Sequence, residues 1–98
     1  MLDYAEISRI VESVAKPALG SKNVVRVFGE PGTDADGNDI VRATIVLAPG
    51  AVDRIDDDAL LRTLVETNKQ LRESGEERQS VVFYATEEEL ATSGDPEP

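Results

Sequence analysis

The chain has 98 residues, with twenty acidic and ten basic side chains, a formal net charge of −10, and neither histidine nor cysteine. These absences remove the usual acid–base group at neutral pH, the common nucleophile–base pairs, and the nitrogen and sulfur ligands of zinc or iron. We therefore expect one small domain that is not an enzyme and uses no cofactor. The negative charge argues against binding to nucleic acid or to an anionic membrane surface.

The sequence predicts a cytoplasmic location. No run of apolar residues is long enough to cross a bilayer. Residues 1–6 are acidic and lack the basic region and apolar core of a signal peptide. No disulfide can form, which is typical of proteins in a reducing compartment.

A first helix is predicted to begin after Asp3, because Asp3 is a typical N-cap and Glu6 completes a capping box. Apolar residues then recur at helical spacing on one face: Ile7, Ile10, Val11 and Val14. Pro17 disfavours the helical conformation at Lys16, so we expect the helix to end near residue 16.

Two strands follow, at residues 24–28 and 40–47, where β-branched and aromatic residues gather. The residues between them, 29–39, are rich in glycine, aspartate and proline, which is typical of a loop. Two strands joined by a loop without helical periodicity indicate an antiparallel hairpin.

A second helix is predicted to begin at Asp56–Asp58, where carboxylates meet the positive end of the helix dipole, and to end at Gly75. One side of this helix is apolar and is expected to be buried: Leu60, Leu61, Leu64, Val65 and Leu71. Residues 80–85 form a third strand. Thr86 and Glu89 can cap one last helical turn through Leu90.

The resulting order, α–β–β–α–β, predicts an α+β fold, a two-layer α/β sandwich with a three-stranded mixed sheet and two helices on one face. This order resembles KH-like and small ferredoxin-like folds, which host many functions, so the resemblance implies an architecture only. The second helix makes strands two and three parallel. We expect residues 1–86 to form a single domain and residues 87–98 an acidic tail, with one helical turn and then disorder.

Such a fold leaves one face of the sheet without helices. Alternation along the strands predicts the residues on this open face: Val24, Arg26, Phe28, Arg42, Thr44, Val46, Val82 and Tyr84. Val25, Val27, Val81, Phe83 and Ala85 are expected to point inward. Aromatic residues and arginine are enriched at interfaces, so one hypothesis is that this face binds a protein partner or forms a homodimer. The other is an ordinary exposed sheet face shielded by arginine stems.

The sequence therefore favours a non-catalytic protein-interaction or regulatory module, and the charge suits a basic partner. The alternative function is binding of a metal or small ligand by the acidic 29–39 loop. Its hard oxygen donors are Asp34, Asp36, Asn38 and Asp39. The spacing departs from an EF-hand, and turn formation explains the same residues without a metal.

Overall fold

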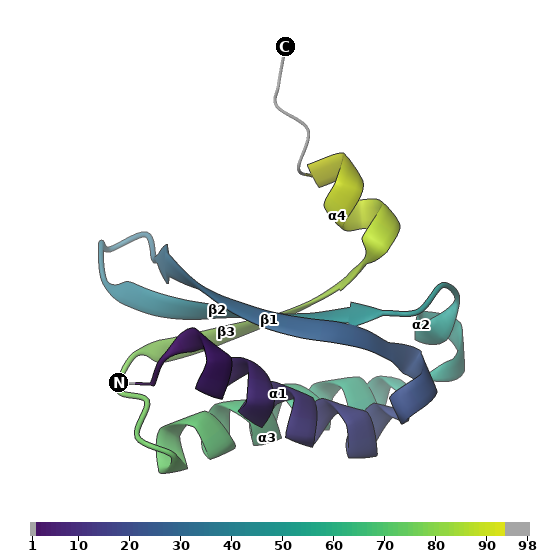
Figure 1. Ribbon diagram of the computed structural model, residues 1–98, viewed down its shortest axis with the longest axis horizontal. Coiled ribbons are helices and arrows are strands. Elements are labelled where there is room, and N and C mark those ends of the chain that lie inside the picture. The colour runs from purple at the N-terminus through teal and green to yellow at the C-terminus, as the bar shows by residue number, and fades with distance from the viewer. Residues whose placement is uncertain (1, 94–98) are drawn as a thin grey trace.

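The computed structural model describes residues 2–93 and shows three strands with two long helices packed beneath them (Figure 1). The last helix is predicted to end near Leu90 and a disordered tail to begin at Thr92, but the helix continues to Ser93; the rest of that tail, residues 94–98, lies outside the described residues. The elements are α1 (Tyr4–Leu19), a 3₁₀ turn (Ser21–Asn23), β1 (Val24–Thr33), β2 (Asp39–Leu47), α2 (Ala51–Arg54), α3 (Asp57–Glu73), β3 (Gln79–Thr86) and α4 (Glu87–Ser93).

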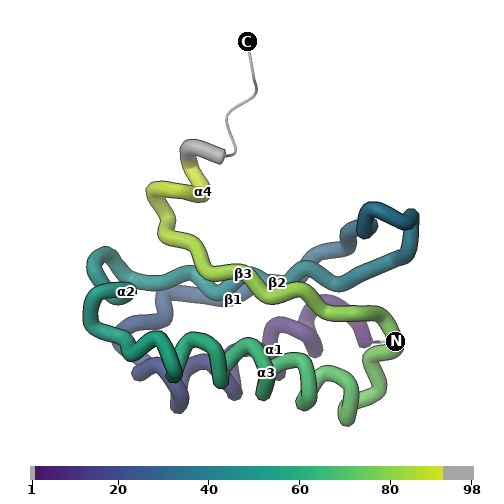
Figure 2. Tube along the Cα trace, turned by 180° about the vertical axis from the view of Figure 1, so that it is seen from behind, coloured from purple at the N-terminus to yellow at the C-terminus, as the bar shows by residue number. Residues whose placement is uncertain are grey.

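The sheet confirms the predicted α+β sandwich. Its strand order is β1-β2-β3, with β1 antiparallel to β2, and β2 parallel to β3. Both α1 and α3 cover the same face, and α4 rises on the opposite side (Figures 1 and 2). None of the helices within residues 2–93 is long and apolar enough to cross a membrane.

Helix α1 begins as predicted but ends later. The Glu6 N–H donates to Asp3 Oδ1 over 2.8 Å, which is the expected cap. The helix then continues to Leu19 instead of ending near residue 16. Pro17 lies in the last turn, where it removes only one helical hydrogen bond. The 5%-exposed Leu19 gains burial by staying helical, and Gly20 at φ 98° closes the helix.

Strand β1 is longer than predicted, because the residues expected to begin a loop continue the strand to Thr33. The connection to β2 therefore shrinks to residues 34–38. Pro31 is tolerated because β1 is an edge strand, where an N–H can go unpaired. Gly29 lets α1 approach closely, since a Cβ there would lie 2.8 Å from Ile7 Cγ2.

The core lies between the sheet and the two long helices. Its fully buried members include Ile7, Val11 and Ala15 of α1 and Val41, Ala43 and Ile45 of β2. Helix α3 buries Thr63, Thr67 and Leu71 instead of the whole predicted apolar side. Leu61 and Val65 are 61% and 63% exposed, because each lies about 100° around the helix from the partly buried Leu60 and Leu64.

The connection between α3 and β3 holds the N-terminus in place. Gly75 ends α3 at φ 107° as predicted, and the next residue, Glu76, is only 3% exposed. Its carboxylate accepts from Arg78 Nε over 2.8 Å and from the Leu2 N–H over 3.1 Å. Arg78 also donates to the Tyr4 hydroxyl over 2.9 Å and lies over the Tyr4 ring. The hydrogen bonds of this ion pair to Leu2 and Tyr4 thus join residues 74 positions apart.

Candidate functional site

The face of the sheet turned away from α1 and α3 is the candidate site. Strand register arranges its side chains in three rows across β1, β2 and β3. These nine residues define the outer face: Arg26–Val46–Ala85, Phe28–Thr44–Phe83 and Glu30–Arg42–Val81. Arg26, Phe28, Arg42, Thr44 and Val46 therefore lie on the predicted side of the sheet, although Thr44 and Val46 are buried rather than exposed there. Their neighbours along the strands, such as Val27 and Ile45, pack in the core.

Strand β3 has the opposite orientation to the one predicted. Val82 packs against the core, and the Tyr84 hydroxyl donates to the Leu60 carbonyl oxygen over 2.7 Å, so both residues face inward. The outward residues are Val81, Phe83 and Ala85, with Phe83 42% exposed. Both sets are apolar, so alternation alone does not choose between them. Tyrosine favours the side where its hydroxyl finds an acceptor.

At the start of strand β1, the orientations of two residues also differ from the prediction. The pairing register shifts between Val24 and Arg26, which is a β-bulge. Val24, predicted to point outward, is 5% exposed in the core, whereas Val25, predicted to point inward, is 48% exposed. From Arg26 onward, the strand follows the predicted alternation.

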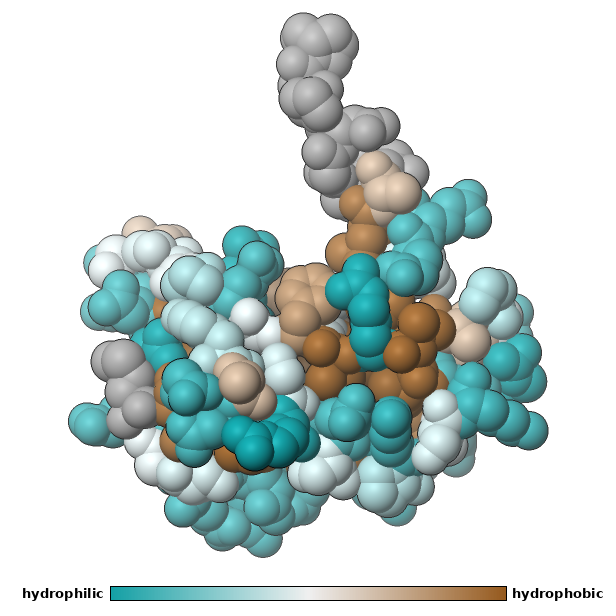
Figure 3. Space-filling model, in the orientation of Figure 1, coloured by the Kyte–Doolittle hydropathy of each residue, from teal (hydrophilic) through white to brown (hydrophobic). Residues whose placement is uncertain are grey.

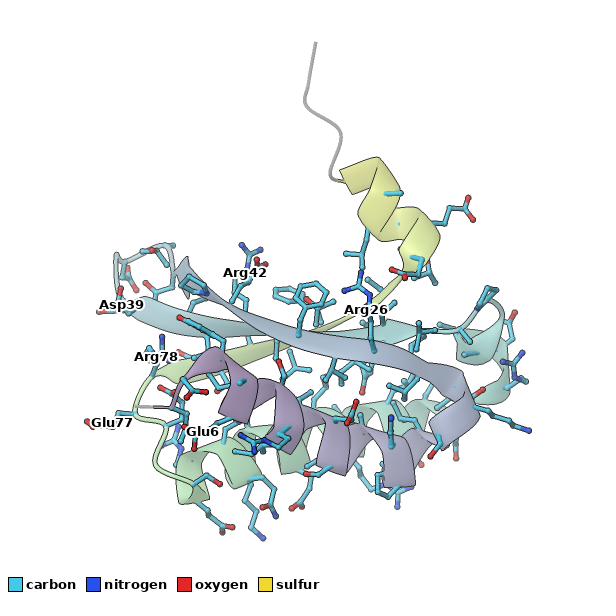
Figure 4. All side chains as sticks on the ribbon, in the orientation of Figure 1. Glu6, Arg26, Asp39, Arg42, Glu77 and Arg78 are labelled. Carbon is cyan, nitrogen blue, oxygen red and sulfur yellow. The ribbon has the colours of Figure 1, made fainter. Side chains whose placement is uncertain are left out.

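Two arginines lie over two phenylalanines on the outer face. The guanidinium carbon of Arg26 is 5.1 Å from the Phe28 ring centroid, and that of Arg42 is 5.5 Å from the Phe83 centroid. Figure 4 shows both arginines on the side of the sheet away from α1. A cation over an aromatic face is attracted by the ring quadrupole. The stacked Arg42 guanidinium can offer N–H donors to carboxylates or carbonyls of a partner, whereas Arg26 donates from Nε and Nη2 to Glu87.

A salt bridge crosses one end of this face. Arg26 Nη2 lies 2.9 Å from Glu87 Oε1, which joins the first strand to the start of α4. The hydrogen bond from Arg26 lowers the pKa of Glu87. Strand β2 lies between the two partners, and its residue in the Arg26 row, Val46, has no exposed surface. The bridge therefore passes over Val46, while Arg26 itself stays about half exposed.

Helix α4 begins with the predicted capping box. The Glu89 N–H donates to Thr86 Oγ1 over 3.1 Å, and the Thr86 N–H donates to Glu89 Oε1 over 2.9 Å. Together with the Glu87 bridge, this box fixes the direction in which α4 leaves the sheet. Hydrophobic side chains gather in the region below α4, beside hydrophilic ones (Figure 3).

The acidic connection between β1 and β2 forms a self-contained turn. Asp34 Oδ1 accepts from the N–H groups of Asp36 and Asn38, each over 2.9 Å, and Asp34 Oδ2 accepts from Asn38 Nδ2 over 3.2 Å. The bond from the Asn38 backbone is the main cause of a lowered Asp34 pKa. Within residues 2–93, no three acidic side chains gather to hold a metal ion. Turn formation thus accounts for Asp34 and Asn38 without a ligand.

Sequence reasoning missed a second apolar surface. A shallow groove of about 930 Å³ runs between α1 and α3. Val14, Pro17, Leu61 and Val65 contribute apolar atoms to it, and Arg62 and Glu66 contribute charged groups. The helical spacing of these apolar residues was the available signal, but it indicated a buried side.

Comparisons with known proteins do not add a function to this geometry. No protein-family model matches the chain, and the searches of curated proteins and of solved structures found no significant match.

Proposed function

We propose that the chain is a non-catalytic, cytoplasmic protein-interaction module, and that the outer face is its contact surface. The observation that carries this proposal is the pair of arginines stacked over Phe28 and Phe83 on a sheet face that α1 and α3 leave uncovered. A sheet commonly buries both of its faces when both are apolar. Here the second layer would come from a partner.

The chemistry of the outer face suits an interface. Phe83 is 42% exposed, and covering such a ring is favourable at roughly 25 cal/mol per Å² of apolar surface. Arginine and aromatic residues dominate the small groups of residues that carry binding energy. The outer face therefore offers two phenylalanine rings, Phe28 and Phe83, on either side of the buried Thr44, with an arginine on either side along the strands.

The local charge narrows the kind of partner. The chain as a whole carries −10, but the outer face places Arg26 and Arg42 on either side of its central row, with Glu87 bound to Arg26 and Glu30 opposite Arg42 in the register. Arginine forks recognise carboxylates by paired hydrogen bonds. We therefore propose a partner surface that combines apolar side chains with carboxylates, in place of the basic partner that the total charge suggests.

The experiment compares two exposed hydrophobic residues on opposite sides of the molecule. Phe83→Ser alters the outer face, and Leu61→Ser alters the helix layer at a side chain that is 61% exposed. Each full-length variant is immobilised and used to capture partners from the native host and purified untagged copies of itself. We expect Phe83→Ser to lose the captured protein and Leu61→Ser to retain it.

Circular dichroism and thermal unfolding establish that both variants stay folded. Capture that survives Phe83→Ser but not Leu61→Ser would move the contact surface to the α1–α3 groove. Capture that survives both substitutions would contradict an outer-face module.

A further inference from the structure

We propose that the partner of the outer face is a second copy of this chain, packed face to face about a two-fold axis, with each α4 lying against the other copy's sheet. This inference rests on the proposed function of the outer face. It follows from the area of the face, the charges of its rows and the length of α4.

The sheet alone is too small for a stable interface. Strands of about eight residues, with about 3.3 Å per residue and about 4.8 Å between strands, give a face on the order of 400 Å². Specific interfaces bury about 800 Å² on each partner. A further element must therefore contribute, and α4 leaves the sheet on the side of the outer face (Figure 1).

The rows of the outer face in one copy complement the rows of the outer face in a second copy. The two-fold axis lies parallel to the sheet, perpendicular to its strands and above the central row. It places Phe28 of one copy against Phe28 of the other, and Phe83 against Phe83. It also places the row of Arg26 opposite the row of Glu30 in the second copy. Each Arg26, which also binds Glu87 of its own copy, thus faces a Glu30, twice in the dimer. A two-fold interface requires this kind of self-complementary surface.

Helix α4 is long enough to span the gap between two packed sheets. Its seven residues span about 10 Å at 1.5 Å per residue, which equals the spacing of about 10 Å between packed sheets. Its first turn carries Glu87, Glu88 and Glu89, and it starts beyond the row of Arg26. In the dimer, that end of the sheet lies over the Arg42 row of the other copy. The acidic turn, whose Glu87 and Glu89 also bind Arg26 and Thr86 of their own copy, therefore approaches Arg42, whose guanidinium has a carboxylate-binding geometry.

The test measures self-association of the full chain by sedimentation equilibrium from micromolar to millimolar concentration. We expect a reversible dimer that Glu30→Arg weakens by about tenfold or more, because Arg26 would then face an arginine. Glu77→Arg makes the same charge change on an exposed glutamate outside the outer face and is expected to leave the dimer unchanged (Figure 4).

Mixing two variants tests the alignment of the rows. Glu30→Arg and Arg26→Glu each place like charges together in their own dimers, but a mixed pair places opposite charges together at both positions. We expect the mixture to restore association that either variant alone has lost. Weakening by Glu30→Arg without restoration on mixing would overturn the proposed row alignment.

Two other outcomes would overturn the second-copy inference. A strict monomer at every concentration would do so while leaving the outer face open to another protein, which the Phe83→Ser capture experiment tests independently. If neither Glu30→Arg nor Arg42→Glu changed the self-association measured by sedimentation equilibrium, the copies would have to meet elsewhere. Unfolding curves of each variant separate lost association from lost structure.

Discussion

Arg26 and Glu87, which are 61 positions apart in sequence, form a salt bridge that spans β2 above the fully buried Val46. Their side chains are 49% and 56% exposed, so solvent screens much of their attraction. The pair therefore adds little to the free energy of unfolding. Its structural effect is to tie α4 to the first strand and to set the angle at which this helix leaves the sheet.

Glu87→Gln is predicted to loosen α4 without destabilising the domain. Exposed ion pairs contribute little to folding, so the midpoint of urea unfolding should stay nearly unchanged. Amide hydrogens of α4 should exchange faster, as measured by mass spectrometry. Glu12→Gln, which removes the similarly exposed Glu12–Lys16 pair, is the control and should leave exchange in α4 unchanged.

Phe83 and Tyr84 are adjacent but are predicted to have opposite roles. Tyr84→Ala removes a ring that packs on the core and a hydroxyl bonded to Leu60, so it should destabilise the fold by about 3 kcal/mol. Phe83→Ala truncates an outward ring and should cost about 1 kcal/mol or less, yet it should weaken self-association. Denaturation and sedimentation measure the two effects. Equal destabilisation by both variants would contradict the observed orientation of β3.

Two buried threonines on α3 provide a matched comparison. Thr63 Oγ1 donates to the Ala59 carbonyl oxygen over 2.7 Å, whereas Thr67 Oγ1 has no hydrogen-bond partner among the described residues. Thr67→Val should stabilise the fold by about 1 kcal/mol, because it removes an unsatisfied buried hydroxyl at nearly constant shape. Thr63→Val should be neutral or destabilising. A loss of stability in both variants, measured by urea unfolding, would argue against this difference.

Glu76 is predicted to make stability fall in acid. Its hydrogen bonds with Arg78 lower its pKa from 4.5 to about 2 in the folded chain. The unfolded chain therefore binds this proton more readily, so the contribution is present above about pH 5 and is lost as pH falls towards 2. That contribution is on the order of 3 kcal/mol.

Glu76→Gln tests this pH dependence. The variant should be about 3 kcal/mol less stable at pH 7, because Arg78 loses the carboxylate of a buried pair. It should also lose less stability than the natural chain between pH 5 and pH 2. If the curves of unfolding free energy against pH for Glu76→Gln and for the natural chain were parallel, other carboxylates would cause the acid sensitivity.

Gly29→Ala is predicted to destabilise the domain by about 1–3 kcal/mol through overpacking. The new methyl group would lie 2.8 Å from Cγ2 of the fully buried Ile7, which α1 holds in place. Ile7→Leu removes this branch, so the cost of Gly29→Ala should be smaller in that background. Thermal unfolding of the two single variants and the double variant measures this coupling. If the costs of Gly29→Ala and Ile7→Leu were simply additive, the strain would not come from the contact with Ile7.

Much of the fold could be predicted because several local signals agreed. The Asp3 cap, the Gly75 stop and the Thr86–Glu89 box each depend on residues within a few positions of one another. Clear alternation in β2 gave the correct side for Arg42, Thr44 and Val46. These features need no knowledge of distant contacts.

The errors arose where long-range contacts decide between locally equivalent choices. The run from Val81 to Tyr84 is apolar at every position, so the inward side of β3 depends on the Leu60 carbonyl that bonds Tyr84. Gly29 and Pro31 look like loop residues, but an edge strand and a close helix accommodate them. The sequence therefore predicted the arginines of the candidate site, but it missed Phe83 and the salt bridge to α4.

The contact between Leu2 and Glu76 also bears on how the chain folds during its synthesis. Because the second residue hydrogen-bonds to the seventy-sixth, the N-terminal helix cannot reach its final anchorage until most of the chain has left the ribosome. The parallel pairing of β2 with β3 imposes a similar delay, since α3 must be made first. The nascent N-terminal half consequently emerges with an incomplete hydrophobic layer and requires its C-terminal half for closure.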